Sequence, residues 1–428
     1  MRSLRWSSRR GRGVGAPLVS FGLVSILCAY AANAGVLSGN CRIAPQPAAT
    51  LLVPYFVADL NHPQGRTTVI SINNAWAKPT IARVVFWTDW GVPTLAFDVY
   101  LTGFDVETLD VRQVFEGNLP TTGAAVSPVG EYSAPNAAFP GCSGATNLHE
   151  AKRQATLDAT MTAFLKAAHT GQALPPTSSQ NSTSTQGLCA ASARQPGQVT
   201  GYVTIDAVNQ CSPLAVGTPA TTPADSAYFV HGGTGIASDD NALWGDIVYL
   251  ENASTPSRSM PAVSLVADPD AMTAGSYTFY GRYSAFDGRD DRIPLSSLYL
   301  IRYANETPTS GSNLVVWRDT RDTAVNPVAC GSSPSWSHMG EEQIVMFDEQ
   351  EDGNELSSPD AFPYATQMVP IGGPSLPTHF SSGFVMLDLW KANSTHAQAW
   401  VGLATTAGNR FTAGHEALRA DDLCNFGP

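Results

Sequence analysis

Short segments in which apolar and polar residues alternate recur along most of this 428-residue chain. In Thr67–Asn73 (TTVISIN), Ile70 and Ile72 fall on one face of an extended chain, and Ala82–Thr88 (ARVVFWT) is rich in β-branched and aromatic residues. Turn residues separate such segments at intervals of about 8–12 residues. No apolar stripe with the period of a helix persists through them. The pattern predicts a mainly β protein built from antiparallel β-sandwich domains of the immunoglobulin-like kind.

One segment departs from this pattern and is predicted to be a helix. In Asn147–Gly171 the apolar residues follow the helical period. Asn147 and Glu150 form a capping-box pair, and Gly171 is a suitable stop. The polar tract Pro175–Gly187 follows and has little to bury. The chain is therefore expected to divide into a signal peptide at 1–34, an N-terminal β-sandwich at 41–135, a helical insert with a flexible polar linker at 136–196, and a second β-rich sandwich domain at 197–428.

The first 34 residues have the pattern of a signal peptide. Five arginines precede an apolar run from Val14 to Ala32, and Ala32–Ala34 offers the small residues of a cleavage site. This pattern predicts an exported protein that resides outside the cell, at the cell surface or in the periplasm.

Removal of that signal peptide would leave 19 basic residues against 36 acidic ones, a net charge of −17. No cluster of Lys or Arg remains to bind a phosphate backbone or an anionic membrane surface, so nucleic acid is not an expected partner. No apolar run of about 18 residues follows the signal, so we expect no membrane span in the mature chain. The partners that remain are a glycan or another surface protein.

Six cysteines follow the predicted signal peptide: Cys41, Cys142, Cys189, Cys211, Cys330 and Cys424. An even number in an exported chain predicts three disulfides. None of them forms a C-x-x-C pair, which argues against zinc and thioredoxin-like chemistry. Spacing alone does not select the pairing. We expect Cys142 to pair with Cys189, because these two bracket the predicted helical insert.

The most acidic stretch of the chain is Phe347–Leu356 (FDEQEDGNEL), which begins where a predicted strand ends. It contains the side chains of a candidate calcium loop: Asp348, Glu351, Asp352, Asn354 and Glu355. An EF-hand is excluded, because its twelfth position would need a bidentate glutamate and is Pro359 here. The alternatives are a looser calcium loop and a solvated strand-end loop. Calcium is the only cofactor that the sequence suggests.

A second candidate site is aromatic. In Trp87–Gly91 (WTDWG), Trp87 and Trp90 flank Asp89 at the end of a predicted strand. Flat rings beside a carboxylate can stack on a sugar and hydrogen-bond to it, and Trp90 is expected to be exposed because it lies past the strand. The alternatives are that these rings fill the core of a sandwich or contact another protein.

Motifs for catalysis are scarce. The sequence contains no G-x-S-x-G, H-E-x-x-H or P-loop. The glycine-rich His231–Asn241 precedes a predicted strand and not a helix, so it is interpreted as a loop. Acidic residues in Phe286–Arg292 and Trp317–Asp322 alternate with arginines, which favours surface ion pairs over a catalytic carboxylate pair. The sequence does not exclude a Ser-His-Asp triad assembled from separate loops, because such a triad is defined by geometry and not by sequence order.

Several segments carry a resemblance to other proteins, among them Ala49–Ala75, Leu243–Leu250, Tyr277–Leu295 and Gln398–Leu418. Together they make most of the mature chain similar to a group of exported bacterial proteins with no established activity. The resemblance implies export and a bacterial source, and it transfers no ligand or catalytic residue.

These observations predict an exported, non-catalytic β-sandwich protein that serves as a structural or binding module at the cell surface or outside the cell. The alternative is a secreted hydrolase that acts on polysaccharide through carboxylates, with calcium support.

Overall fold

Antiparallel strands make up most of the chain that the computed structural model describes. The described residues are 46–120, 157–176, 185–212, 214–217, 227–251, 257–272, 276–284, 290–305, 311–319, 325–332, 334, 343–356, 362–389, 397–407 and 411–419, and all belong to one structural unit, 42–428. The predicted signal peptide lies outside them, as do Asn147 and the cysteines Cys41, Cys142 and Cys424. None of the helices in the described ranges is long and apolar enough to cross a membrane.

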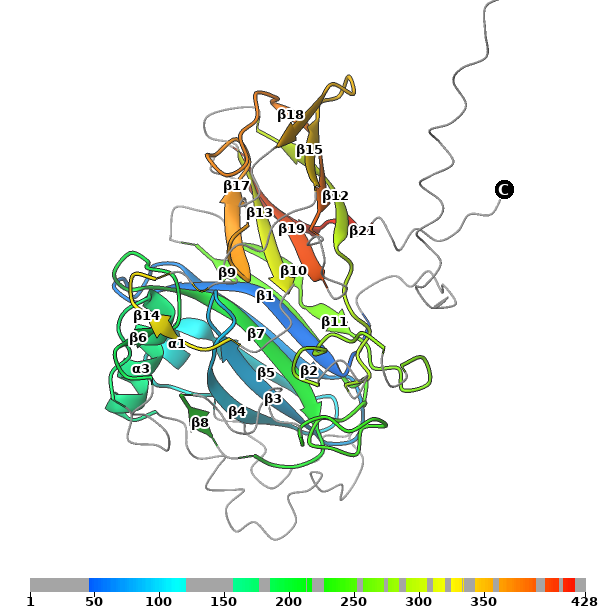
Figure 1. The fold of residues 1–428 in the computed structure, drawn as a ribbon. Helices are drawn as coiled ribbons and strands as arrows, with labels where there is room; N and C mark the ends of the chain where they lie inside the picture. The colour runs from blue at the N-terminus through cyan, green and yellow to red at the C-terminus, as the bar shows by residue number, and fades with distance from the viewer. Residues whose placement is uncertain are drawn as a thin grey trace, which may run out of the picture. The chain divides into compact units, whose positions relative to one another are not determined.

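Two sheets form the first sandwich (Figure 1). The strands of the six-stranded sheet are, in spatial order, β11 (Val263–Leu265), β1 (Thr50–Asp59), β7 (Gln198–Val208), β3 (Thr80–Trp87), β4 (Pro93–Leu101) and β8 (Ala215–Val216). The four-stranded sheet has the order β10 (Arg258–Pro261), β9 (Leu243–Leu250), β2 (Thr67–Asn74) and β5 (Val106–Asp110). Within the described residues every pairing in these two sheets is antiparallel.

Two more sheets form the second sandwich. The first has the order β16 (Gly353–Leu356), β15 (Gln343–Phe347), β18 (Ser382–Asp388), β12 (Leu298–Ala304) and β21 (Leu418–Arg419). The other has the order β17 (Thr366–Pro370), β13 (Gly311–Asp319), β19 (Gln398–Ala407) and β20 (Phe411–Glu416). Their inner faces share a separate apolar core that includes Tyr299, Leu314 and Val385. The prediction of a mainly β, antiparallel sandwich protein is confirmed.

The sheets differ from the sequence expectation in two details. Strand β7 lies between β1 and β3, so the chain after residue 197 returns to the first sandwich and the expected boundary at 197 does not match the sheets. The change of sandwich comes between β11 and β12. A six-stranded sheet is also larger than the sheets of an immunoglobulin constant domain, so the strand order does not support that detail.

Strands β1 and β7 are covered on both faces. One face of their sheet contacts β2 and β9, and the other contacts β13 and β17 of the second sandwich. Consecutive residues such as Leu51, Leu52 and Val53 are therefore all fully buried, although their side chains point to opposite faces. Burial on both faces explains why β1 is a nearly continuous apolar run.

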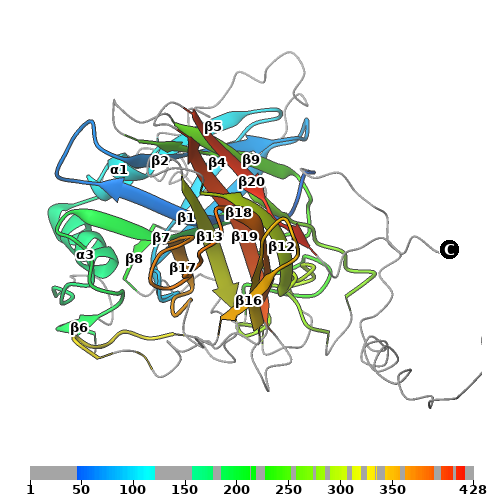
Figure 2. The same cartoon turned by 90° about the horizontal axis from the view of Figure 1, so that it is seen from above.

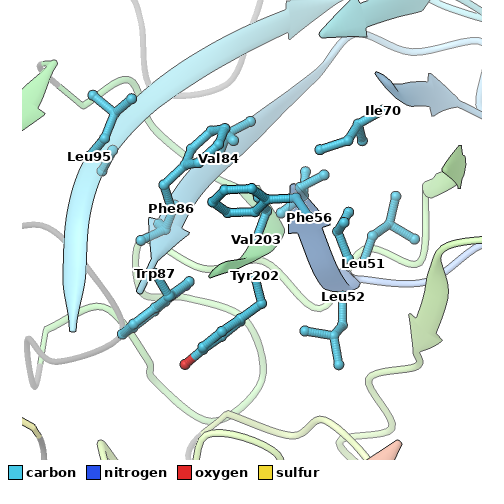
Figure 3. Packing of buried hydrophobic residues seen from close by; sticks show 14 of the residues in the cluster. Leu51, Leu52, Phe56, Ile70, Val84, Phe86, Trp87, Leu95, Tyr202 and Val203 are labelled. Carbon is cyan, nitrogen blue, oxygen red and sulfur yellow. The ribbon is translucent and has the colours of Figure 1, made fainter. Parts of the chain in front are cut away.

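The core of the first sandwich is rich in aromatic rings (Figure 3). Phe56 of β1 meets Phe86 of β3 edge to face at 5.4 Å between centroids. Trp87 stacks on Tyr202 at 5.7 Å with nearly parallel rings, and its indole N–H donates to the Thr204 hydroxyl at 2.8 Å. Complete burial of an aromatic side chain of this size stabilises a fold by about 1.5–3 kcal/mol.

Two described helices accompany the first sandwich. Helix α1 (Val111–Phe115) follows β5 directly, with Asp110 as its N-cap. Helix α3 (Ala159–Thr170) packs against β7 and ends at Gly171, whose left-handed φ of 69° confirms the predicted stop (Figure 2). It begins at Ala159 because the Asp158 carboxylate accepts the Met161 N–H as an N-cap. The predicted cap at Asn147 lies outside the described residues.

One disulfide joins distant parts of the chain. Strands β6 (Leu188–Cys189) and β14 (Val328–Ala329) pair antiparallel, and this brings Cys189 and Cys330 to a Cα–Cα distance of 4.9 Å with a bond between their sulfurs. The expected pairing of Cys189 with Cys142 is therefore wrong. Cys211 is also disulfide-bonded.

Replacing Cys189 and Cys330 together by Ala is expected to lower the free energy of unfolding by about 2–4 kcal/mol, because the bridge constrains a long loop of the unfolded chain. Urea denaturation of the oxidised protein measures this change. Non-reducing peptide mapping checks the pairing: the Cys189 peptide should be joined to the Cys330 peptide, and a Cys189–Cys142 peptide would contradict the structure.

Candidate functional site

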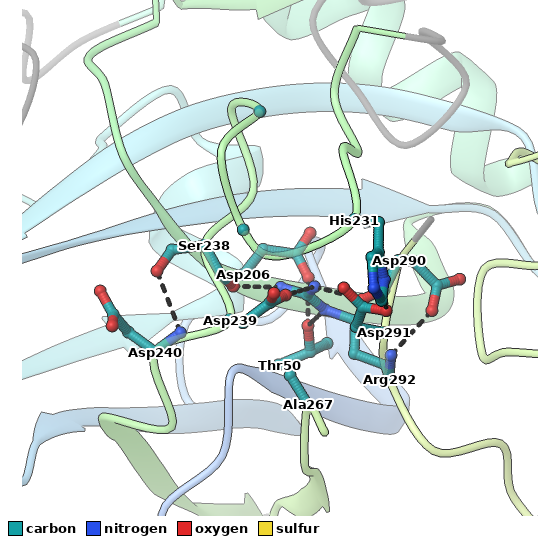
Figure 4. A network of polar contacts seen from close by, with 12 residues as sticks. Thr50, Asp206, His231, Ser238, Asp239, Asp240, Ala267, Asp290, Asp291 and Arg292 are labelled. Atoms are coloured by element: carbon teal, nitrogen blue, oxygen red, sulfur yellow. Dashed lines mark hydrogen bonds and ion pairs between the residues drawn. The ribbon is translucent and has the colours of Figure 1, made fainter. Parts of the chain in front are cut away.

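Arg292 is the centre of a buried polar network (Figure 4). Its Nε–H donates to Thr50 Oγ1 at 2.7 Å, and its Nη2–H donates to the Ser238 carbonyl at 2.7 Å. Its Nη1–H donates to the Asp290 carbonyl at 2.6 Å and forms an ion pair with Asp239 at 3.4 Å. One guanidinium therefore joins the first strand of the sandwich to two loops that are far apart in sequence.

Asp206 on β7 is fully buried, and hydroxyl groups surround it. Its carboxylate accepts hydrogen bonds from Thr50, from Tyr228 at 2.7 Å and from Tyr280 at 3.0 Å. Thr50 receives the Arg292 Nε–H on the same oxygen, so its hydroxyl connects the guanidinium to the carboxylate. Burial raises the pKa of Asp206, and the charge of Arg292 opposes that rise.

Asp290 is held inside the same region by the chain around it. Its carboxylate accepts the backbone N–H groups of Tyr280 at 2.7 Å and Arg292 at 2.9 Å, and the hydroxyl of Thr278. Burial nevertheless raises the pKa of Asp290 to about 7, since three donors do not replace the hydration of the carboxylate.

His231 and Asp291 form the part of the network that reaches the surface. His231 Nδ1 lies 2.5 Å from Asp291 Oδ1; the imidazole is 54% exposed and the carboxylate is buried. The Gly232 N–H donates to the other Asp291 oxygen at 2.8 Å. Asp291 has a left-handed φ of 53°, and Gly232 and Gly233 also have positive φ, so the loop needs its two glycines to fold over this carboxylate.

Asp239 is a second carboxyl beside this pair, and its pKa is raised. Burial raises its pKa to about 7, Arg292 opposes the rise, and the neighbouring Asp291 charge adds to it. Its buried Oδ2 receives no hydrogen bond from the described residues as long as the group is ionised. A proton on Asp239 would provide the donor for the contact with Asp291. Below about pH 7 the protonated Asp239 can therefore donate a hydrogen bond to Asp291.

The sequence interpretation of these charges as surface ion pairs is wrong. Asp290, Asp291 and Arg292 are all buried. In the other acidic and basic segment Arg318 and Asp319 are buried too, and Asp319 pairs with Arg282 at 2.8 Å, while Arg321 and Asp322 lie outside the described residues. The long-range placement of the His231 loop over residues 290–292 explains the difference.

The acidic stretch Phe347–Leu356 forms the turn of the β15–β16 hairpin and its second strand. Asp348 Oδ1 accepts the N–H groups of Gln350 and Asp352, so this carboxylate closes the turn. Asn354 and Glu355 are consecutive in β16, and their side chains point to opposite faces. Within the described ranges, which include the whole stretch, no three His, Cys, Asp or Glu side chains are arranged to hold a metal ion. The side chains of the predicted calcium loop, which include Glu351, are therefore not arranged to coordinate a calcium ion.

Trp87, Asp89 and Trp90 lie close together, but they do not form an exposed platform. Trp87 and Asp89 are fully buried and Trp90 is 5% exposed, so the expectation that Trp90 is exposed is wrong. Asp89 accepts hydrogen bonds from the N–H and hydroxyl of Ser192 and from Arg194 at 2.6 Å. Burial still raises the pKa of Asp89.

An open pocket of about 210 Å³ lies beside this group. Its lining residues include Trp90, Tyr364, Ser192 and the disulfide cysteine Cys189. Among the described residues, those that line it carry no carboxylate, imidazole or basic side chain. This lining suits a small neutral group.

The exposed aromatic residues lie elsewhere. Trp76, Phe104 and Trp244 are among the most exposed large apolar side chains, together with Val106. In the β2 register Asn73 pairs with both Val106 and Trp244, and the Phe104 N–H donates to the Trp76 carbonyl at 2.8 Å. We call Trp76, Phe104, Val106 and Trp244 the aromatic face. The sequence analysis missed it, although a tryptophan in a turn between two strands was a usable signal.

Comparisons of the chain with protein-family models, with curated proteins and with solved structures found no match. Function is therefore inferred from the side chains of this chain alone.

Replacing Arg292 by Ala is expected to lower the free energy of unfolding by about 3–5 kcal/mol, because it leaves buried carboxylates without their counter-charge. Arg292→Lys should lose less, since it keeps the charge and loses the fork of donors. Chemical denaturation measures both. The control is Arg302→Ala, whose exposed pair with Glu349 should contribute less than about 1 kcal/mol. Equal effects of the Arg292 and Arg302 substitutions would contradict the network.

The raised pKa of Asp239 predicts a pH dependence. Its folded-state pKa of about 7 lies above the ordinary value of 3.8, so the folded state binds the extra proton between these pH values. The stability that this proton contributes is complete below about pH 4 and is lost as the pH rises through 7.

Asp239→Asn mimics the protonated acid, and it should flatten the fall in stability between about pH 4 and 7 and raise stability at pH 8. Thermal unfolding across this range measures the effect. The control is Asp240→Asn, whose contact with the network is through its backbone N–H to Ser238. If Asp239→Asn keeps the wild-type slope, the raised pKa of Asp239 is contradicted.

Proposed function

We propose that this protein is an exported, non-catalytic β-sandwich module that works by binding a partner at its surface. The aromatic face carries the proposal. Large apolar side chains that gather on an exposed surface mark interaction sites, and tryptophan is the residue most enriched at their energetic centres. Trp76, Phe104 and Trp244 are at least one-third exposed on neighbouring strand ends and turns.

Export is supported by two independent features. The N-terminal residues have the signal-peptide pattern. The bond between Cys189 and Cys330 is of the kind that persists in oxidising compartments such as the periplasm and the extracellular space. The resemblance to exported bacterial proteins agrees with both.

The His231–Asp291 pair favours a second candidate function, a secreted hydrolase. A buried carboxylate on Nδ1 fixes the orientation of an imidazole, as in the histidine of a general base, and this imidazole is half exposed. The pair would then activate water for attack on a bond of a polysaccharide or an ester.

One comparison tests the two candidates. The mature protein and its His231→Ala variant are assayed on chromogenic glycosides, esters and dyed polysaccharides, and the secreted form is sized by mass spectrometry. The proposed module should be cleaved after Ala34 and should show the same background turnover in both forms. Turnover that falls at least about 100-fold in His231→Ala would replace the module by the hydrolase.

A further inference from the structure

We propose that the aromatic face binds a neutral glycan, with the indole rings of Trp76 and Trp244 stacked on its sugar rings. This inference rests on the proposed function of a binding module and names the ligand class. Three observations carry it: the placement of the rings, the rigidity of the turns that present them, and the polar row beside them.

The strand register places the apolar side chains in one row across the sheet. Asn73 of β2 pairs on one side with Val106 of the edge strand β5 and on the other side with Trp244 of β9. Directly paired residues point to the same face, and adjacent strands lie about 4.8 Å apart. Val106 and Trp244 are therefore about 10 Å apart, a span of about two sugar rings. Trp76 and Phe104 extend this row at its end, on the turns that leave β2 and precede β5.

Buried hydrogen bonds hold these turns in place. The side chain of Asn74, 2% exposed, donates to the carbonyls of Lys78 at 2.7 Å and Thr102 at 2.8 Å, and it accepts the Trp76 N–H at 3.0 Å. The second turn lies so close to the first that a Cβ on Gly103 would meet the Ala77 carbonyl oxygen at 2.1 Å. The backbone that carries Trp76 and Phe104 is thus held in place before any ligand binds, which lowers the entropy lost on binding.

Phe104 adds evidence that the face is a functional site. It has a left-handed φ of 57°, which is rare for a bulky residue, and its side chain is 53% exposed. A strained backbone that keeps a large apolar ring in water lowers the stability of a fold, and such strain concentrates at binding and catalytic sites. Among the described residues, no ring contact involves Trp76, Phe104 or Trp244, so these rings are not part of the aromatic core.

A polar row lies one step along the same face. Ser71 pairs with Thr108 on one side and Asp246 on the other, so two hydroxyls and a carboxylate lie side by side. Two residues along a strand span about 6.8 Å, so this row is within reach of the hydroxyls of a sugar that stacks on the rings. The flat apolar rings would stack on the face of a sugar ring, and the polar row beside them would bind its hydroxyls.

Charge decides between classes of glycan. The two turns and the two rows contain the acidic residues Asp105 and Asp246, and the basic residue Lys78. This excess of negative charge repels uronic acids, sulfated sugars and phosphates. A neutral glycan meets no such barrier, and its hydroxyls can donate to Asp246.

Affinity electrophoresis of the folded mature protein tests the inference, with soluble mixed-linkage β-glucan, xyloglucan and galactomannan in the gel and alginate as the anionic probe. Migration should be retarded by at least one neutral glycan and not by alginate. Trp244→Ala and Trp76→Ala should each weaken the retardation about tenfold, and Trp244→Phe should keep part of it. The matched control is Phe411→Ala, which removes a 71% exposed ring from the second sandwich and should change nothing. Circular dichroism confirms that the variants fold.

The outcomes separate this inference from the proposed function. No retardation by any neutral glycan, or equal retardation of wild type and both tryptophan variants, overturns the glycan. If the protein then binds protease-sensitive material of a bacterial envelope through Trp244, the aromatic face serves a protein partner and the proposed function stands. Turnover that depends on His231, with no binding at the aromatic face, overturns both.

Discussion

The six-stranded sheet of the first sandwich is covered on both faces, and most other features of the molecule follow from this. Strand β1 contacts β2 and β9 of the four-stranded sheet and also β13 and β17 of the second sandwich, and β7 contacts helix α3 and β17. Every side chain along them must therefore find a partner inside the protein. Apolar side chains meet this condition by packing. The polar residues Thr50 and Asp206 can meet it only through hydrogen bonds.

The network around Arg292 supplies the hydrogen bonds that these buried polar residues need. A carboxylate on a strand without access to water needs donors, and Asp206 receives them from Thr50, Tyr228 and Tyr280. Arg292 brings one positive charge to a region with several carboxyls, and the remaining excess is relieved by raised pKa values at Asp239 and Asp290. The same contacts attach two loops without regular structure to the sheet. Such networks can specify the position of each loop on the sheet, even where they add little net stability to the fold.

Local structure followed from local sequence. The alternating segment Thr67–Asn73 became β2, and Gly171 ended its helix as its freedom of φ suggested. Pairing over long distances did not follow, because neither strand nor cysteine carries a local mark of its partner. The insertion of β7 between β1 and β3 and the Cys189–Cys330 bond both belong to this class. The contact between His231 and Asp291 is a third example, because neither loop carries a sequence motif that points to the other.

The aromatic residues show the same limit most clearly. Trp87 and Trp76 both stand where a β-segment meets a turn, so the sequence around them does not tell the core from the surface. What separates them is the number of layers that cover each sheet. The β3 sheet lies between two others, and Trp87 is enclosed against Tyr202 and Tyr283. The β2–β5–β9 sheet has Ile70 on its covered face, and Trp244 and Val106 on its other face are exposed to water. Its position in the stack of layers therefore makes this sheet the one that can present tryptophan to a ligand.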